Sequence, residues 1–534
     1  MKKKPKAISY DIATLHPAVT GSSILVTVIF PNGNKKKFLI DCGIFQEFSF
    51  EGYNNNIPFD VRNIDFAFLT HNHVDHSGRF PYIVSEGYQN EIYCTQNTKD
   101  MLATALFDCV RILENNSKFE TKRKKKFVKP LYGNSDVLNT LKLTRGMEYN
   151  KPYDIDENFT VTFLGNGHLL GASCILVQIK EAECEEVNLL FTGDYKKDNL
   201  FQEVPQIPKW VKKLKLVIIQ ESTYGNSTSN DIKKSYDNVI TKLMDENKTV
   251  ISPVIACERA EQILLRLKEL KDNNRIDKNV PIFLTGDLAT MYFKIFLKKS
   301  QIDFVPYNLS IVSEKKSNYN SPMLENKNFN IIKEIPDIVL NDKFSKIILT
   351  TSGMGDHGKA PYYMSKLCMR DDVNLLFSCY LPPNSLGAKL QKLEAGSDYT
   401  FNIMGEKITI PINSEVISCN EFSSHAKSDE LIEFLKMFPN LSGVFINHGV
   451  PNTKELYMQR LMDEIKELDF VYIMSRSIYY SLTNYEVTKI KSSKFISLDD
   501  IKQSERKNIK EQVPKKSKPK YKRHRFRLLS YTTH

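Results

Sequence analysis

The chain has 534 residues, 41% of them hydrophobic, which is ordinary for a globular protein with more than one domain. No run of about 18 apolar residues occurs, and the basic residues 1–6 lead into no apolar signal-peptide core, so we expect a cytoplasmic protein without a membrane span. The nine cysteines are scattered singly without a Cys-x-x-Cys pair, which predicts reduced core residues. The net charge of +11 is compatible with a polyanionic partner such as RNA, although solvated basic faces are also common.

The first segments predict a sheet. Residues 8–42 alternate apolar and polar side chains around turn signals, which indicates a β-hairpin, and Asp41 stands where a strand ends. Residues 64–69 then form an apolar run that reads as a buried strand.

Four strong metal ligands follow this strand within six residues: His71, His73, Asp75 and His76. Imidazole and carboxylate without cysteine suit zinc in an open site rather than a closed structural clip. A polar surface loop is the weaker interpretation, because the whole chain has only ten histidines.

Helices are expected over residues 80–86 and 98–115, and the second is long and ends in the basic run 122–126. We interpret that run as a solvated surface segment and regard phosphate contact as the less favoured alternative. Strands are expected over 159–164 and 188–191. The first is followed by glycines that let the backbone bend closely around His168, and the second by Asp194.

Strands and helices alternate from about residue 216 to 415, which predicts an α/β domain with a parallel sheet. The chain then carries a histidine in each of two polar segments, 421–429 and 447–449. Residues 514–527 are strongly basic with interleaved aromatics, a composition that suits sequence-tolerant RNA contact or an idle tail equally well.

The spacing His71-x-His73-x-Asp75-His76 resembles the signature of the metallo-β-lactamase superfamily. Residues 220–225, 259–262, 350–358, 421–429 and 447–449 are similar to motifs of its nucleic-acid-cutting branch, the β-CASP nucleases, so the resemblance covers most of residues 8–450. It implies an α/β fold, namely an αββα sandwich with an inserted α/β domain. The expected divisions are 1–215 and 416–485 for the sandwich, 216–415 for the insertion, and 486–534 for a basic, flexible extension.

The resemblance also implies a site with two zinc ions, for which manganese could substitute. The first ion would be held by His71, His73 and His168, the second by Asp75, His76 and His448, with Asp194 between them. Asp41 would orient the ligand loop. His425 would supply a proton to the departing oxygen, Glu221 would hold His425, and Asp75 would serve catalysis as well as metal binding.

RNA contacts are expected at Arg259, Ser352, Lys515 and Lys516. The segment around Ser352 departs from the family, because Asp356-His357 stands where relatives usually have a glycine pair nearby.

The implied function is a metal-dependent ribonuclease that cuts single-stranded RNA internally and leaves 5′-phosphate and 3′-hydroxyl ends. A 5′–3′ exoribonuclease in the manner of RNase J, and a non-catalytic RNA-binding scaffold, remain alternatives. Small-molecule hydrolases of the superfamily lack the insertion, and DNA-repair members usually have valine in place of His448. The expected partner is RNA, with no membrane, and a homodimer is left open.

Overall fold

The structure is a computed structural model that describes residues 6–47, 49–228, 235–313, 329–379, 381, 384–403, 406–419, 421–476 and 478–492. Lys515 and Lys516, and with them the basic segment 514–527, lie outside the described residues. The described chain forms two compact units. The first contains residues up to 199, 204–228 and those from 425 onward, and the second contains 200–203 and 235–424.

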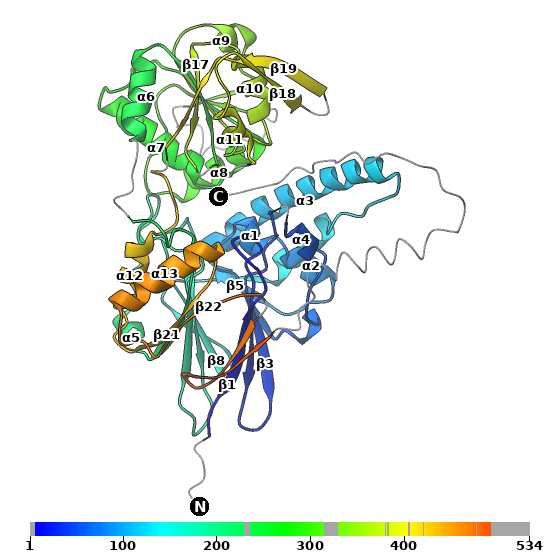
Figure 1. Ribbon diagram of the computed structural model, residues 1–534, viewed down its shortest axis with the longest axis vertical. Coiled ribbons are helices and arrows are strands. Elements are labelled where there is room, and N and C mark those ends of the chain that lie inside the picture. Colours follow the sequence, from blue (N-terminus) through cyan, green and yellow to red (C-terminus); the bar gives the residue numbers. More distant parts are fainter. Residues whose placement is uncertain are drawn as a thin grey trace, which may run out of the picture. The chain divides into compact units, whose positions relative to one another are not determined.

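The first unit is built on two sheets that lie face to face (Figure 1). One has the order β24-β23-β1-β2-β3-β4-β5-β6 and the other β22-β21-β11-β10-β9-β8-β7. The strands of the first sheet are β1 (Ser9–Thr14), β2 (Ile24–Ile29), β3 (Lys35–Ile40), β4 (Phe66–Phe68), β5 (Ile92–Thr95), β6 (Thr144–Met147), β23 (Ile478–Thr483) and β24 (Glu486–Ser492). Those of the second are β7 (Pro152–Asp156), β8 (Phe159–Gly165), β9 (Ser173–Ile179), β10 (Val187–Phe191), β11 (Leu216–Gln220), β21 (Leu441–Ile446) and β22 (Phe470–Ile473).

The core of this unit lies between the two sheets. Phe38 and Phe68 of the first sheet pack in one cluster with Phe159 and Phe191 of the second, and all four side chains are buried. Burying each such ring contributes roughly 1.5–3 kcal/mol to folding. The alternation of apolar side chains along these strands therefore explains why the two sheets face each other.

Helices cover both outer faces of the sandwich. The first sheet is covered by α1 (Val74–Ser77), α2 (Phe80–Ser85), α3 (Gln96–Lys124) and α4 (Asn134–Leu143), with the short 3-10 helices η1 (Glu51–Tyr53) and η2 (Val61–Asn63) nearby in the chain. The second sheet is covered by α5 (Lys209–Lys212), α12 (Ser428–Lys436) and α13 (Pro451–Glu464). This helix–sheet–sheet–helix arrangement confirms the predicted αββα sandwich.

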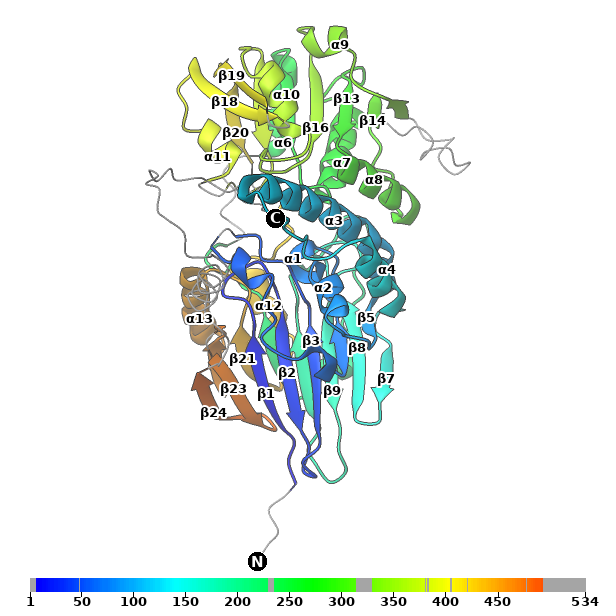
Figure 2. The same ribbon diagram turned by 90° about the vertical axis from the view of Figure 1, so that its right-hand side faces the viewer.

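The second unit is an α/β domain with an all-parallel sheet in the order β15-β14-β13-β16-β12-β17-β20 (Figure 2). Its strands are β12 (Thr249–Pro253), β13 (Ile282–Thr285), β14 (Leu309–Val312), β15 (Phe329–Ile332), β16 (Lys346–Thr350), β17 (Val373–Phe377) and β20 (Glu415–Ser418). Its helices are α6 (Tyr236–Asp245), α7 (Arg259–Asp272), α8 (Asp287–Lys299), α9 (Asp337–Asn341), α10 (Ala360–Leu367) and α11 (Leu386–Leu390). A hairpin of β18 (Ser397–Ile403) and β19 (Glu406–Ile412) completes it, and the predicted inserted α/β domain is confirmed.

Three boundaries differ from the sequence-based expectation. The second unit begins after residue 228 rather than at 216, because β11 pairs with β10 and β21 of the sandwich. It ends at residue 424 rather than 415, because β20 pairs with β17. Residues 486–492 of the expected extension form β24, which pairs with β23.

Candidate metal centre

The ligand loop is fixed by backbone hydrogen bonds to the segment that follows β3. The amides of Cys42 and Ile44 donate to the carbonyls of His76 and Val74, at 2.7 and 2.9 Å. Between them, Gly43 lies so close to the loop that a Cβ there would be 1.5 Å from the carbonyl oxygen of Asp75. Only a glycine fits at this close approach. The loop that follows β4 is therefore held at a fixed position beside the strand end that carries Asp41.

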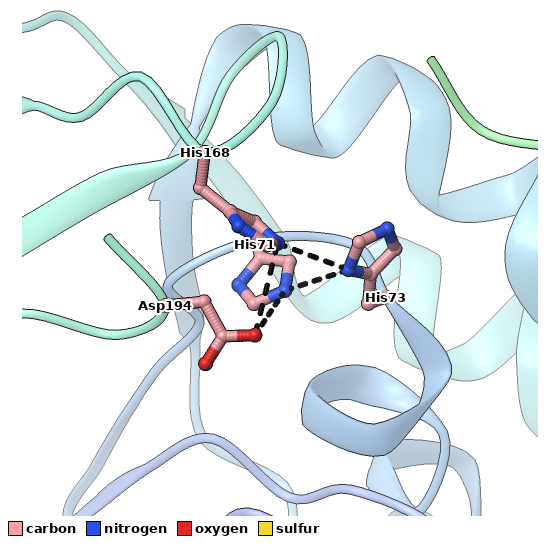
Figure 3. Close-up of side chains that lie close together, drawn as sticks. All are labelled: His71, His73, His168 and Asp194. Carbon is pink, nitrogen blue, oxygen red and sulfur yellow. Dashed lines mark hydrogen bonds and ion pairs between the residues drawn. The ribbon is translucent and has the colours of Figure 1, made fainter. Parts of the chain in front are cut away.

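Four side chains form the first ligand group (Figure 3). His71 Nε2 and His168 Nε2 lie 3.1 and 3.2 Å from His73 Nδ1, and the same two nitrogens lie 3.8 and 3.7 Å from Asp194 Oδ2. Three imidazole nitrogens and one carboxylate oxygen therefore converge on one point, although they come from the loop after β4, the loop after β8 and the end of β10.

The second group contains Asp75, His76 and His448, which were also expected from the sequence. Asp194 joins the two groups, because its Oδ1 lies 3.3 Å from His76 Nε2 and 3.2 Å from His448 Nδ1 while its Oδ2 faces the first group. The structure thus brings all seven predicted ligands together, with one aspartate oxygen directed at each group.

Buried atoms in this centre fit metal ions. His76 Nε2, His448 Nε2 and Asp194 Oδ1 are buried and have no hydrogen-bond partner among the described residues. Such groups are costly unless something compensates them. Burial lowers the pKa of His71 and of His448, which keeps their imidazoles neutral and able to donate a lone pair. Five histidines and two carboxylates are ligands that suit a divalent transition metal, and zinc among them.

Asp41 contacts one of the candidate ligand histidines directly and a second through Thr70. Its Oδ2 lies 2.7 Å from His76 Nδ1, so that Nε2 of this ring faces the metal group. Asp41 also accepts hydrogen bonds from the amide and the hydroxyl of Thr70, at 2.8 and 2.9 Å, and the same hydroxyl oxygen lies 3.0 Å from His71 Nδ1. Asp41 therefore fixes His76 directly and His71 through Thr70, as outer carboxylates do at many metal sites.

His425 and Glu221 form a buried pair beside the ligands. His425 Nδ1 lies 3.0 Å from Glu221 Oε2, and His425 Nε2 lies 3.8 Å from Asp194 Oδ2. Burial works against a charge on this imidazole, but the carboxylates of Glu221 and Asp194 outweigh it and raise the pKa of His425 to about 9. Glu221, the largest of the raising influences, therefore favours the protonated form of His425 beside the two ligand groups.

Comparison with known proteins agrees with this geometry. Residues 17–171 match the model of the metallo-beta-lactamase superfamily, residues 260–390 the Beta-Casp domain, and residues 409–473 the Zn-dependent metallo-hydrolase RNA specificity domain. The chain is 30% identical to the probable RNase MJ4 of Methanocaldococcus jannaschii, over 78% of this chain and 88% of that protein. The chain belongs to the β-CASP nucleases of the metallo-β-lactamase superfamily.

Other β-CASP relatives are longer than this chain. The transcription termination factor FttA of a Lokiarchaeum species is 25% identical, over 73% of this chain and 59% of its own length. The endoribonuclease YSH1 of Candida glabrata is 24% identical, over 89% of this chain and 60% of its own length. The alignment with each of these two thus spans about three fifths of the relative's length. Among the described residues, no helix has the length and apolar character needed to cross a membrane.

The β-CASP family motifs did not reveal every residue that shapes the centre. Thr70, which links Asp41 to His71, and Thr223, whose hydroxyl oxygen lies 3.0 Å from His448 Nδ1, were not singled out from the sequence. Their positions gave a signal, because Thr70 precedes the first ligand and Thr223 lies two residues after Glu221. A hydroxyl within two residues of a candidate site residue in the sequence is thus worth testing as an orienting group.

The expected RNA contacts Arg259 and Ser352 belong to the second unit, not to the unit that holds the metal ligands. Arg259 is buried at the start of α7, with its guanidinium 5.9 Å from the ring of Phe422. Ser352 Oγ accepts a hydrogen bond from the His357 amide at 3.2 Å, so this hydroxyl shapes its own loop. RNA contact by these two residues stays a prediction.

Proposed function

We propose that this β-CASP protein is a zinc-dependent endoribonuclease that cuts single-stranded RNA and leaves 5′-phosphate and 3′-hydroxyl ends. The observation that carries this proposal is the pair of His425 and Glu221 beside two complete ligand groups. A non-catalytic scaffold would not need a histidine with a raised pKa, His425, next to seven positions that all carry ligand-type side chains. The match to an RNA specificity domain and the similarity to a probable RNase and an endoribonuclease support RNA as the substrate.

Two zinc ions would be held by the ligand groups that share Asp194, and we expect manganese to substitute on ligand grounds. When bound, such ions lower the pKa of a water molecule toward about 7 and neutralise charge that develops on phosphate oxygens. The chain's own contribution is orientation. Asp41 and Thr70 fix two of the rings, and Asp194 presents one oxygen to each group.

His425 would act as the proton donor of the hydrolysis. Water adds to the phosphorus, the bond from phosphorus to the 3′ oxygen breaks, and the departing oxygen takes a proton from His425 Nε2. Glu221 holds Nδ1 of the same ring, so Nε2 is the nitrogen that faces Asp194 and is available to the substrate. One proton of the attacking water passes to solvent, and His425 takes a proton back from solvent before the next cut. The other hydrogen of the water remains on the new 5′-phosphate or is lost to solvent, and one water molecule is consumed for each cut.

The decisive experiment uses a single-stranded RNA labelled at either end, with the metal-loaded full chain, its His425→Ala variant and a DNA of matched sequence. Internal fragments with 5′-phosphate ends from the wild type alone would support the proposal. Stepwise release of nucleotides from the 5′ end would replace it by a 5′–3′ exoribonuclease. Uncut RNA that remains bound to the protein would favour the scaffold alternative. Metal analysis of the purified protein tests the zinc assignment, with about two ions expected per chain.

A further inference from the structure

The basic run near residue 122 begins within a long helix, as the sequence suggested. Helix α3 continues into this run as far as Lys124, nine residues beyond residue 115. In Figure 1 the far end of α3 projects beyond α4 of the same unit. Along this end, one helical face carries exposed side chains with the spacing i, i+4, i+7, i+8 and i+11. We call this face the α3 stripe: Arg111, Asn115, Lys118, Phe119 and Lys122.

Two of the three cations of the stripe, Lys118 and Lys122, differ from their neighbours in their pairing, whereas Arg111 pairs with Asp108 at 2.6 Å. Arg123 and Lys124 both contact Glu120 Oε2, at 2.5 and 3.3 Å. Within the described part of the chain, no acidic side chain forms an ion pair with Lys118 or Lys122. The helix dipole favours cations in the last turn of α3, but its effect falls off within that turn and does not account for Lys118. Lys118 and Lys122 therefore present positive charge that the fold itself does not use.

Two phenylalanine rings are exposed at the same end of α3. Phe119 lies within the stripe and is 57% exposed, and Phe127, in the segment after the helix, is 74% exposed. Two hydrogen bonds hold that segment against the helix. The carbonyl of Val128 accepts from the Ser117 hydroxyl, and the amide of Val128 donates to Thr121 Oγ1 at 2.9 Å. The ring of Phe127 is thus held beside the basic end of the helix. A merely solvated surface has no need of two large apolar rings.

Cations alternating with exposed rings suit a single-stranded polyanion whose bases are free to stack. Lysines take the phosphates, and aromatic faces take the bases without regard to sequence. A membrane surface would require a broad apolar face, whereas the stripe offers one ring among three cations. We propose that the α3 stripe, together with Phe127, is a second binding surface for single-stranded RNA, separate from the metal centre. This inference rests on the proposed function for the identity of the nucleic acid.

The other end of α3 is hydrogen-bonded to the loop that carries His168. Thr95, the N-cap of α3, and Thr98 donate hydrogen bonds from their hydroxyls to the carbonyl of Gly171 at 2.6 and 2.8 Å. Gly171 closes the loop that carries His168. At 1.5 Å per residue, Lys118 lies roughly 33 Å along the helix from its start. An RNA would have to be long to reach both places, so the surface should matter for long RNAs and not for very short ones.

The test is fluorescence anisotropy with a labelled RNA of about 20 nucleotides, which exceeds the site of roughly 4–16 nucleotides typical of one such surface. The protein is the metal-loaded full chain, and gels check that the RNA stays intact. The variant Lys118→Ala/Phe119→Ala/Lys122→Ala should weaken binding at least about 10-fold. It should also reduce the slope of log K against the logarithm of the salt concentration by roughly 1.4, which is 0.7 for each of the two lost phosphate contacts. Phe127→Ala alone should weaken binding without changing the salt dependence.

The matched control is Arg123→Ala/Lys124→Ala, which removes the same charge from the same helix but from residues that already pair with Glu120. The control should bind RNA nearly as well as the wild type. An equal loss in both variants would mean a net-charge effect and would overturn the proposal. So would unchanged binding by the stripe variant, or stripe-dependent binding to anionic vesicles with none to RNA. Melting curves confirm that the exposed substitutions leave the fold intact.

The outcomes for this surface and for the enzyme are separable. A protein that cuts RNA while its stripe variant binds normally would refute the stripe and leave the endoribonuclease standing. A protein that binds RNA through the stripe but never cuts it would refute the nuclease activity alone.

Discussion

His425 Nδ1 lies 3.0 Å from Glu221 Oε2, and both side chains are buried. The carboxylate of Glu221 is itself held, because Oε1 accepts a hydrogen bond from the Tyr195 amide at 2.5 Å. The arrangement fixes the ring of His425 through one nitrogen and directs the other toward Asp194. A donor that must keep its proton near neutral pH needs this kind of carboxylate support.

The pH dependence of RNA cleavage tests that relationship. Glu221 is the largest influence that raises the pKa of His425 against the effect of burial, so this carboxylate keeps the imidazole a proton donor near neutral pH, and the role is lost as the pH rises further. Glu221→Gln removes the largest raising influence, and the alkaline limb of kcat should move to lower pH by at least about one unit.

The control for this variant is Glu433→Gln, which changes an exposed carboxylate on α12 that lies 3.9 Å from Lys197. It should leave the profile where the wild type has it. An alkaline limb that stays in place in Glu221→Gln would show that another group supplies the proton.

Metal affinity tests the role assigned to Asp41. Asp41→Asn keeps the size of the side chain but weakens the contacts to His76 and Thr70 that orient two ligand rings. Loss of such an outer carboxylate typically costs about 10- to 100-fold in metal affinity, measured here by competition with a chelator. Asp65→Asn is the matched control, since Asp65 also accepts a backbone hydrogen bond, from Lys37 at 2.8 Å, without touching a ligand. Equal affinities in the two variants would contradict the orienting role.

Gly43 offers a test of the loop's backbone. A Cβ at this position would lie 1.5 Å from the carbonyl oxygen of Asp75, and backbone cannot yield as a flexible side chain does. Gly43→Ala should therefore displace the ligand loop and reduce the bound metal well below two ions per chain, measured by elemental analysis of folded protein. Gly133→Ala, where nothing lies within 4 Å of the added carbon, should keep the full metal content. Full occupancy in Gly43→Ala would refute the close-approach argument.

The sequence predicted which side chains come together at the candidate metal centre better than it predicted their surroundings. His71 to His76 lie together in the chain, so their spacing was sufficient, and family motifs supplied the distant His168, Asp194 and His448. The contact from Asp41 through Thr70 to His71 depends on the ends of β3 and β4 lying side by side. The pattern of apolar residues in the sequence predicts each strand but not which strands are neighbours.

The units were predicted in kind but not in extent. The apolar sequence of β11 would suit a strand of the sandwich or of the insertion equally well. Its pairing with β10 and β21 shows that it belongs to the sandwich. The last turns of α3 are almost wholly polar, so no apolar stripe predicts their helical state, which is supported by the hydrogen bonds of the returning segment at Val128.

Metal removal should destabilise the protein, and more strongly as the pH rises. In the metal-free fold, burial raises the pKa of Asp75 to about 7, whereas an aspartate in the unfolded chain titrates near 3.9. Between these values the folded state holds more protons than the unfolded state, so the free energy of unfolding of the metal-free protein falls as the pH rises toward 7. With metal bound the carboxylate is compensated and this loss is absent. The difference in melting temperature between metal-loaded and chelated protein should therefore grow from pH 5 to pH 7.5.

The control for this prediction is the metal-free Asp75→Asn variant, which cannot titrate at this position. Its melting temperature should fall less over the same interval than that of metal-free wild type, because one buried carboxylate has been removed from the proton balance. The comparison is made entirely without metal, so the loss of a ligand in the variant does not enter. If the two metal-free proteins lost stability in parallel, the dependence would have to come from other buried groups, and Asp75 would not be the residue whose charge the metal ions compensate.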